Sequence, residues 1–139
     1  MLRTLFVAAF LFPLTVHAAS PCTSSFEEYL SAFQRDPVFQ QEHRQYPLRY
    51  SFLDTNAEPE PRAVKRRLSA AQAMKESGIG FPSLETEKAK GLERTVKNAK
   101  KGTYVVRFDK PDSGVFSIEF HFSRVGNCWR LVEVNDFSL

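Results

Sequence analysis

The apolar residues of the first clearly patterned segment follow the spacing of an α-helix. Four of them recur at positions i, i+3, i+4 and i+7, which places them on one face of a helix: Phe26, Tyr29, Leu30 and Phe33. Ser24 and Ser25 are each followed three residues later by a glutamate, which offers two registers of a capping box. The pattern predicts an amphipathic helix with an aromatic face that ends near Arg35.

The next segment predicts a short helix and then a strand. Asp36 and Pro37 supply a capping side chain and a first-turn proline, so residues 38–43 are expected to form a second helix at an angle to the first. Pro47 stops the helix from continuing. Residues 48–54 then alternate apolar and polar side chains, which predicts a half-buried strand, and the prolines of residues 55–61 predict a loop.

Residues 61–101 are rich in charge and poor in apolar side chains. A third helix is predicted from Pro61 to Gly78, because a thin apolar stripe follows helical spacing: Val64, Leu68, Ala71 and Met74. Residues 84–101 fit either one charged helix or a short helix followed by a strand at about 92–98. Gly91 favours the second interpretation, since glycine commonly ends a helix.

The last third of the chain has the period-two alternation of three consecutive antiparallel strands, separated by turns at residues 112–114 and 125–127. The side chains expected to face inward form an apolar wall: Tyr104, Val106, Phe108, Phe116, Ile118, Phe120 and Phe122. Glu119 and His121 fall on the opposite face, where we expect cross-strand surface pairs with Arg107 and Arg130 rather than a metal or acid–base site.

The chain begins with the pattern of a secretory signal. Arg3 precedes an apolar run over residues 5–16, and the small side chain of Ala18 predicts cleavage after residue 18. The run is too short for a transmembrane helix and contains Pro13, so we expect no stable membrane insertion after cleavage. The remaining residues 19–139 have the length of one domain, and the expected location is periplasmic or secreted.

Only two cysteines are present, Cys22 and Cys128. In an oxidising compartment an isolated pair predicts a disulfide, which here would tie the N-terminal arm to the last strand. A redox-active pair would instead favour the Cys-x-x-Cys spacing, which is absent.

Positive charge is concentrated in one part of the chain. Residues 62–101 contain eleven Lys and Arg side chains against four Glu. This asymmetry would suit an acidic protein partner, an anionic envelope polymer or a lipid surface, although a solvated helical face is the simpler interpretation. The expected partner surface is Arg62, Lys65, Arg66 and Arg67. Nucleic acid is not expected as a partner, because aromatic residues are not interleaved with the charges and the compartment is wrong.

The order of elements resembles the nuclear-transport-factor-two-like superfamily, a cystatin-like α+β cone, and in particular its exported bacterial members of unknown function. The resemblance is carried by the aromatic helix at 26–33, the Phe39-Gln40 pair, Tyr46-Pro47-Leu48 and the run from Gly126 to Leu131. It implies N-terminal helices packed on a curved antiparallel sheet, with a C-terminal three-strand meander. Dimers formed through the outer face of the sheet are common in such folds, so a homodimer is possible.

Catalytic signatures are absent from the sequence: there is no Walker loop, no metalloprotease motif and no nucleophile elbow. The resemblance implies that an enzyme on this fold would place an acid, a base or a tyrosine inside the cone, where this chain has an aromatic wall. Asp36 and His43 are the only candidates for acid–base catalysis, as part of a group at the cone mouth with Glu42 and Tyr46. No metal site and no cofactor are expected.

Three functions stay open at this point. The leading hypothesis is an exported non-enzymatic module that docks a protein partner, as an envelope adaptor or as an immunity protein that neutralises a toxin. The second is a carrier of a small apolar ligand, held in the cone by Phe33, Phe39, Tyr50, Phe52, Phe120 and Trp129. The third is a small hydrolase or isomerase that uses Asp36 and His43.

Overall fold

A computed structural model of the chain describes residue 22 and residues 25–139. The predicted signal sequence and cleavage site lie outside these residues. Among the described residues, no helix has both the length and the apolar character needed to cross a bilayer.

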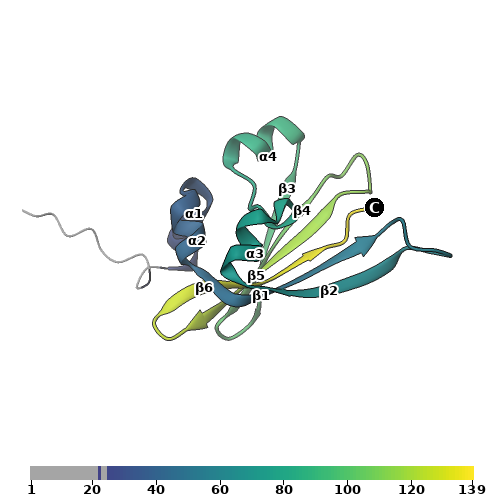
Figure 1. Ribbon diagram of the computed structural model, residues 1–139. Coiled ribbons are helices and arrows are strands. Elements are labelled where there is room, and N and C mark those ends of the chain that lie inside the picture. The colour runs from purple at the N-terminus through teal and green to yellow at the C-terminus, as the bar shows by residue number, and fades with distance from the viewer. Residues whose placement is uncertain (1–21, 23–24) are drawn as a thin grey trace, which may run out of the picture.

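Two helices, two strands, a second helical segment and four further strands follow one another along the described chain, with the helices gathered on one side of the sheet (Figure 1). The helices are α1 (Phe26–Arg35), α2 (Pro37–Glu42), α3 (Ala70–Lys75), the 3-10 turn η2 (Ser77–Ile79) and α4 (Leu84–Lys90). The strands are β1 (Arg44–Asp54), β2 (Arg62–Leu68), β3 (Glu93–Lys100), β4 (Thr103–Asp109), β5 (Ser117–Val125) and β6 (Cys128–Asp136). The two N-terminal helices, the first strand, the helix-then-strand interpretation of residues 84–101 and the C-terminal meander are confirmed.

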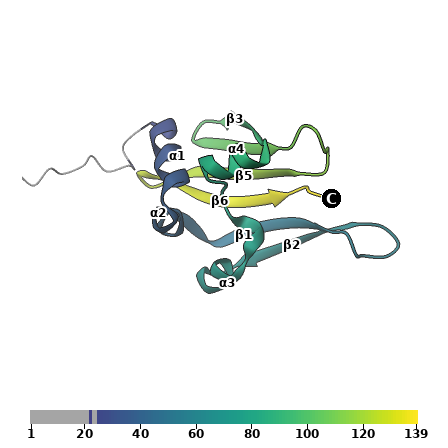
Figure 2. The same ribbon diagram turned by 90° about the horizontal axis from the view of Figure 1, so that it is seen from above.

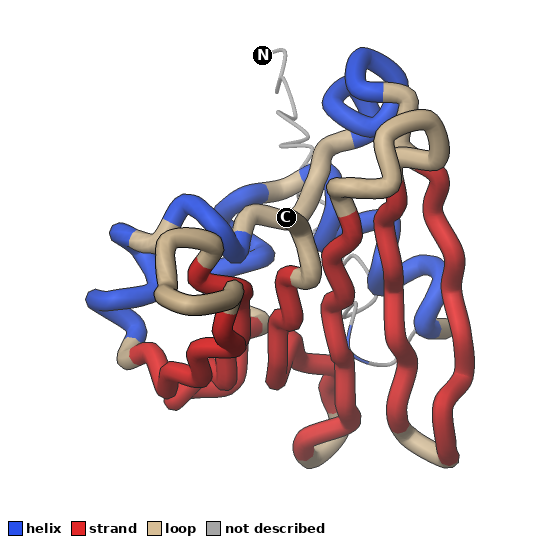
Figure 3. Tube along the Cα trace, turned by 90° about the vertical axis from the view of Figure 1, so that its right-hand side faces the viewer, coloured by secondary structure: helices blue, strands red, loops and turns tan. Residues whose placement is uncertain are grey.

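The six strands form one sheet in the order β2-β1-β6-β5-β4-β3. Neighbouring strands are antiparallel except for β1 and β6, which pair in parallel. The sheet is curved and not closed, and Figure 3 shows the β1–β2 ribbon bending away from the remaining strands. From above, α3 lies at the β1–β2 end and α4 at the β3–β4 end (Figure 2). The expected α+β fold with helices on a curved sheet is confirmed. The sheet differs from the expected antiparallel one in a single pair, because β1 and β6 run parallel.

The core lies between the concave face of the sheet and the helices. Five of the seven predicted wall residues are buried, whereas Tyr104 and Phe116 are half-buried at its margins. Phe122 meets the ring of Phe33 edge-on at 5.1 Å between centroids, and Phe81 reaches in from the loop before α4 to within 4.8 Å of Phe120. Aromatic rings from both layers therefore fill the centre of the cone, and a hollow of about 650 Å³ lies beside it between α1 and the β3–β4 end of the sheet.

The predicted helix over residues 61–78 is wrong in its first half. Arg62–Leu68 is strand β2, which pairs with β1 so that Val64 lies opposite Phe52 and Leu68 opposite Leu48. A spacing of four residues places side chains on one face of a helix and also on one face of a strand, so Val64 and Leu68 fit both structures. The helix begins only after Ser69, whose hydroxyl and the Gln72 side chain form a complete capping box.

Candidate functional site

The aromatic side chains expected to line a ligand pocket are packed against one another. Phe33 and Phe120 are fully buried, Tyr50 and Trp129 nearly so, and Phe39 and Phe52 lie half-buried at the margin of the core. Trp129 packs edge-on against Phe26 at 5.1 Å. These residues act as core in the structure, and Tyr50 also borders a hollow between β1 and β2.

Asp36 and His43 are placed at opposite ends of α2 and do not form a catalytic pair. Asp36 caps the helix: its Oδ1 accepts hydrogen bonds from the backbone N–H groups of Val38 and Phe39 at 2.9 and 3.3 Å. His43 is the C-cap of the same helix, seven residues after Asp36, which is a rise of about 10 Å along the axis. The carboxylate is therefore a cap, and the imidazole belongs to a different cluster.

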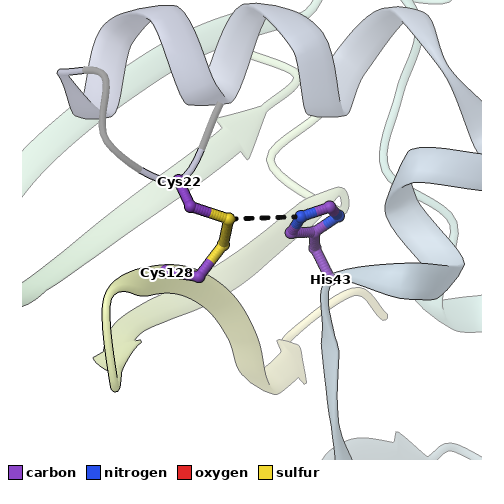
Figure 4. A group of neighbouring side chains, drawn as sticks. All are labelled: Cys22, His43 and Cys128. Atoms are coloured by element: carbon purple, nitrogen blue, oxygen red, sulfur yellow. Dashed lines mark hydrogen bonds between the residues drawn. A yellow bond between two sulfur atoms is a disulfide. The ribbon is translucent and has the colours of Figure 1, made fainter. Parts of the chain in front are cut away.

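That cluster joins His43 to the two cysteines. Cys22 and Cys128 form a disulfide with their Cα atoms 4.2 Å apart, as the sequence predicts. His43 Nε2 lies 3.8 Å from Cys22 Sγ (Figure 4). Sequence reasoning found the disulfide and singled out His43 separately, but missed that they are neighbours. The parallel pairing of β1 with β6 brings them together, and no local motif signals it.

A polar network crosses the outer face of the sheet. Arg49 Nε donates to Glu133 at 2.8 Å, and Glu133 also accepts from the Asn135 amide at 2.9 Å. His121 lies 3.0 Å from Glu119, and Arg107 lies 3.4 Å from the same carboxylate. Partial burial alone would raise the pKa of Glu133, but hydrogen bonds from the Asn135 amide and Arg49, with the charges of Arg49 and His121, lower it overall.

The expected cross-strand pairs of Glu119 and His121 are confirmed for Arg107 and wrong for Arg130. A register shift in the β5–β6 ladder between His121 and Phe122 sets His121 opposite Glu133. Arg130 then lies opposite Ser123 and donates to the backbone oxygen of Glu42 at 3.0 Å. A bulge of this kind re-aims side chains and is not visible in the alternation of the sequence.

The basic cluster that was expected on one helix lies on a strand, so its side chains divide between two faces. Arg66 lies opposite Tyr50 on the concave side, and its guanidinium pairs with Glu76 at 3.0 Å. Lys65 and Arg67 point to the outer face, where Arg67 lies opposite Arg49. A hollow of about 500 Å³ lies there. Its lining comprises Arg49, Tyr50, Ser51, Lys65, Arg66, Arg67, Glu133 and Asn135.

Sequence reasoning also missed a small group of ionisable side chains around Tyr50. Burial, together with the charges of Glu76 and Asp136, raises the pKa of the Tyr50 hydroxyl to about 12, against a smaller opposing effect of Arg66. Gly78 passes directly over this hydroxyl, since a Cβ at residue 78 would lie 2.2 Å from it. Because β2 was interpreted as a helix, nothing in the sequence placed these residues together.

Comparison with solved structures identifies the class of fold. The chain matches the crystal structure of an NTF2-like protein from Bacteroides fragilis with a TM-score of 0.59, at 16% sequence identity and over 84% of this chain. It spans about half the length of that protein, 48%. No family model and no curated protein matches the sequence. The chain therefore has an NTF2-like fold, which agrees with the predicted resemblance, and its function has to be argued from its own surface.

Proposed function

We propose that the protein is an exported, non-enzymatic binding module that docks an acidic, extended segment of a partner protein along β2. The observation that carries the proposal is the hollow on the outer face, where Arg49, Lys65 and Arg67 converge beside an edge of the sheet. A filled aromatic interior and a capping role for Asp36 give no support to catalysis inside the cone.

The charges of this surface are available to a partner. Arg49 is held by Glu133, but neither Lys65 nor Arg67 forms an ion pair with another described residue. Both side chains are exposed and stand two residues apart on one strand. Carboxylates at alternate positions of an added strand would therefore lie opposite both of them.

The edge of β2 supplies the second part of the interaction. β2 is the first strand in the sheet order, and within the described part of the chain it pairs only with β1, so the sheet leaves one side of its backbone unused. Extended peptides commonly bind such edges by continuing the hydrogen-bond ladder, while alternate side chains provide the specificity. The same lysine and arginine residues discourage pairing with uncharged edges, so the surface would select for negative charge.

The test uses two peptides of about eight residues, a length within the usual range for a strand. One alternates Glu and Thr, and the matched control alternates Lys and Thr. Fluorescence anisotropy should detect binding of the acidic peptide only, with an affinity that falls as salt rises because the exposed charges are screened. Hydrogen exchange at the β2 amides should slow on binding.

The charge-reversal variant K65E/R67E should lower the affinity for the acidic peptide roughly tenfold or more. The matched control K97E/K100E makes the same change in net charge on β3, the opposite edge of the sheet. It should leave binding close to that of the parent chain. Equal loss in both variants would indicate a response to net charge alone and would refute the site, as would binding that does not change with salt.

A further inference from the structure

Three side chains from distant parts of the sequence place one metal-ligating atom each at the same point. The two Sγ atoms of Cys22 and Cys128 and a ring nitrogen of His43 all lie within 4.8 Å of one another. In the oxidised protein the two sulfurs are bonded to each other and neither is a thiolate (Figure 4). What the cluster can do therefore depends on whether the disulfide is closed.

The imidazole is held in the orientation of a metal ligand. His43 Nδ1 lies 2.8 Å from the backbone oxygen of Phe39, and because a carbonyl only accepts, Nδ1 carries the proton. The lone pair of the neutral ring is then on Nε2, the atom that faces Cys22 Sγ. Histidine ligands of metals are commonly fixed by such a hydrogen bond from the second nitrogen to a carbonyl.

Packing and backbone hydrogen bonds keep the ring in this place. It stacks on Phe39 with 3.7 Å between centroids, and Tyr29, which is fully buried, meets it edge-on at 5.8 Å. The N–H of Leu131 donates to the backbone oxygen of His43 at 2.8 Å, which ties His43 to the strand that begins with Cys128. The nitrogen donor is therefore positioned before any metal arrives.

We propose that reduction of the disulfide converts this cluster into a Cys2His site for a thiophilic d10 cation, Cu(I). In a trigonal site the metal–sulfur bond is about 2.3 Å long and the metal–nitrogen bond about 2.0 Å. The sulfur and nitrogen atoms bound to one ion are then about 3.7 Å apart. His43 Nε2 already lies 3.8 Å from Cys22 Sγ. When both sulfurs bind the same ion they lie about 4 Å apart, which rotation of the cysteine side chains after reduction can provide.

The choice of metal follows from the donor set. Thiolate ligands favour Cu(I) and Zn²⁺ over hard cations. Three donors complete a trigonal sphere for Cu(I), whereas Zn²⁺ takes a fourth ligand in a tetrahedral site. Cys128 is only 8% exposed while Cys22 and His43 are half-buried, so the site is shielded on one side and open on the other.

Reduction of the Cys22–Cys128 disulfide requires two electrons and two protons, which a dithiol can supply. One dithiol sulfur attacks a sulfur of the protein disulfide, and the second closes the reductant into its own disulfide. Two electrons and two protons thereby pass to the protein, leaving both Cys22 and Cys128 as thiols. Binding of Cu(I) then displaces these two protons to solvent, and His43 Nε2 supplies the third ligand without losing one.

The test compares the oxidised full chain with the full chain reduced by a phosphine and separated from it under anaerobic conditions. Each is titrated with Cu(I) against a chromogenic Cu(I) chelator. The reduced chain should bind one equivalent and the oxidised chain none. X-ray absorption should find two sulfur ligands and one nitrogen ligand. H43A should weaken binding roughly tenfold or more, and the matched control H121A, a histidine outside the cluster, should leave it unchanged.

Either of two binding results would overturn the proposal: a reduced chain that does not compete with the chelator, or an H43A variant that binds as tightly as the parent with sulfur ligands alone. Where reduction by itself unfolds the chain, Cu(I) should restore the near-ultraviolet circular dichroism of Trp129, because the free energy of metal binding adds to that of folding. Failure to restore that signal would equally reject the site.

Discussion

Substitution of Gly78 by alanine tests the packing of the segment after α3 against β1. A Cβ at residue 78 would lie 2.2 Å from the Tyr50 hydroxyl oxygen and 3.2 Å from the ring carbon that carries it. The ring must retreat by roughly 1 Å to restore van der Waals contact. It is 5% exposed and stacks on Phe52 at 5.2 Å, so it has little room to do so.

The expected magnitude combines two opposing effects. Overpacking of a buried site destabilises a protein by about 1–3 kcal/mol. Replacing glycine by alanine restricts the unfolded chain and stabilises by about 0.4–1 kcal/mol. G78A should therefore lower the free energy of unfolding by about 1–2 kcal/mol, measured as a shift of the urea midpoint at constant slope.

The Y50F background isolates the contact. Without the hydroxyl, the nearest ring atom stands at 3.2 Å, a distance that a shift of a few tenths of an ångström relieves. G78A should then be close to neutral, which gives a coupling of about 1–2 kcal/mol in the double-mutant cycle. The matched control is G80A, where the added Cβ would meet its nearest atom, the Ser77 backbone oxygen, at 3.8 Å. An equal loss in both backgrounds, or a loss in G80A as large as in G78A, would refute this reasoning.

Three further predictions concern stability. The double variant C22S/C128S should lower the free energy of unfolding by about 2–5 kcal/mol in urea, because the disulfide closes a loop between residues 106 apart in sequence; a loss below the error of the titration would contradict a closed disulfide. F122A should lower it by about 3–5 kcal/mol, since this ring is fully buried and meets four other aromatic rings; a value near zero would argue against a filled cone. The pKa of Tyr50 is about 12 in the native state against about 10 unfolded, so its contribution is complete below pH 10 and is lost as pH rises toward 12. Y50F should show a shallower alkaline loss of stability than the parent in urea titrations over that range, and identical slopes would contradict the shift.

The sequence predicts the fold well wherever the spacing of the apolar residues fits only a helix or only a strand. Phe26, Tyr29, Leu30 and Phe33 share a helical face but not a strand face, and they form α1 as expected. The long alternation from residue 116 to residue 122 fits only a strand, and it forms β5. Local chemistry at Asp36 and Gly91 also places the start of α2 and the end of α4.

Prediction fails where the spacing is shared by both structures. Val64 and Leu68 are four residues apart, and only pairing with β1 decides that they belong to a strand. The error had consequences for the surface, because consecutive side chains of a helix fan out by about 100° each, whereas the strand sends Arg66 to the concave side and places Lys65 and Arg67 together on the outer face. The residues of the predicted partner surface are therefore divided between two faces.

The chemistry of the molecule depends on contacts that no local pattern encodes. His43 ends a six-residue helix, and Cys128 begins the last strand. The two residues lie close together because β6 pairs in parallel with β1, and because the Leu131 N–H of β6 donates a hydrogen bond to the backbone oxygen of His43. A meander alone would have placed β6 beside β5 with its other edge free. In this protein β1 pairs with the free edge of β6, which brings His43 beside the Cys22–Cys128 disulfide. The next strand outward is β2, whose far side forms an edge of the sheet. One long-range pairing thus underlies both proposed sites, and each can be tested without disturbing the other, because Lys65 and Arg67 lie outside the Cys22, His43 and Cys128 cluster.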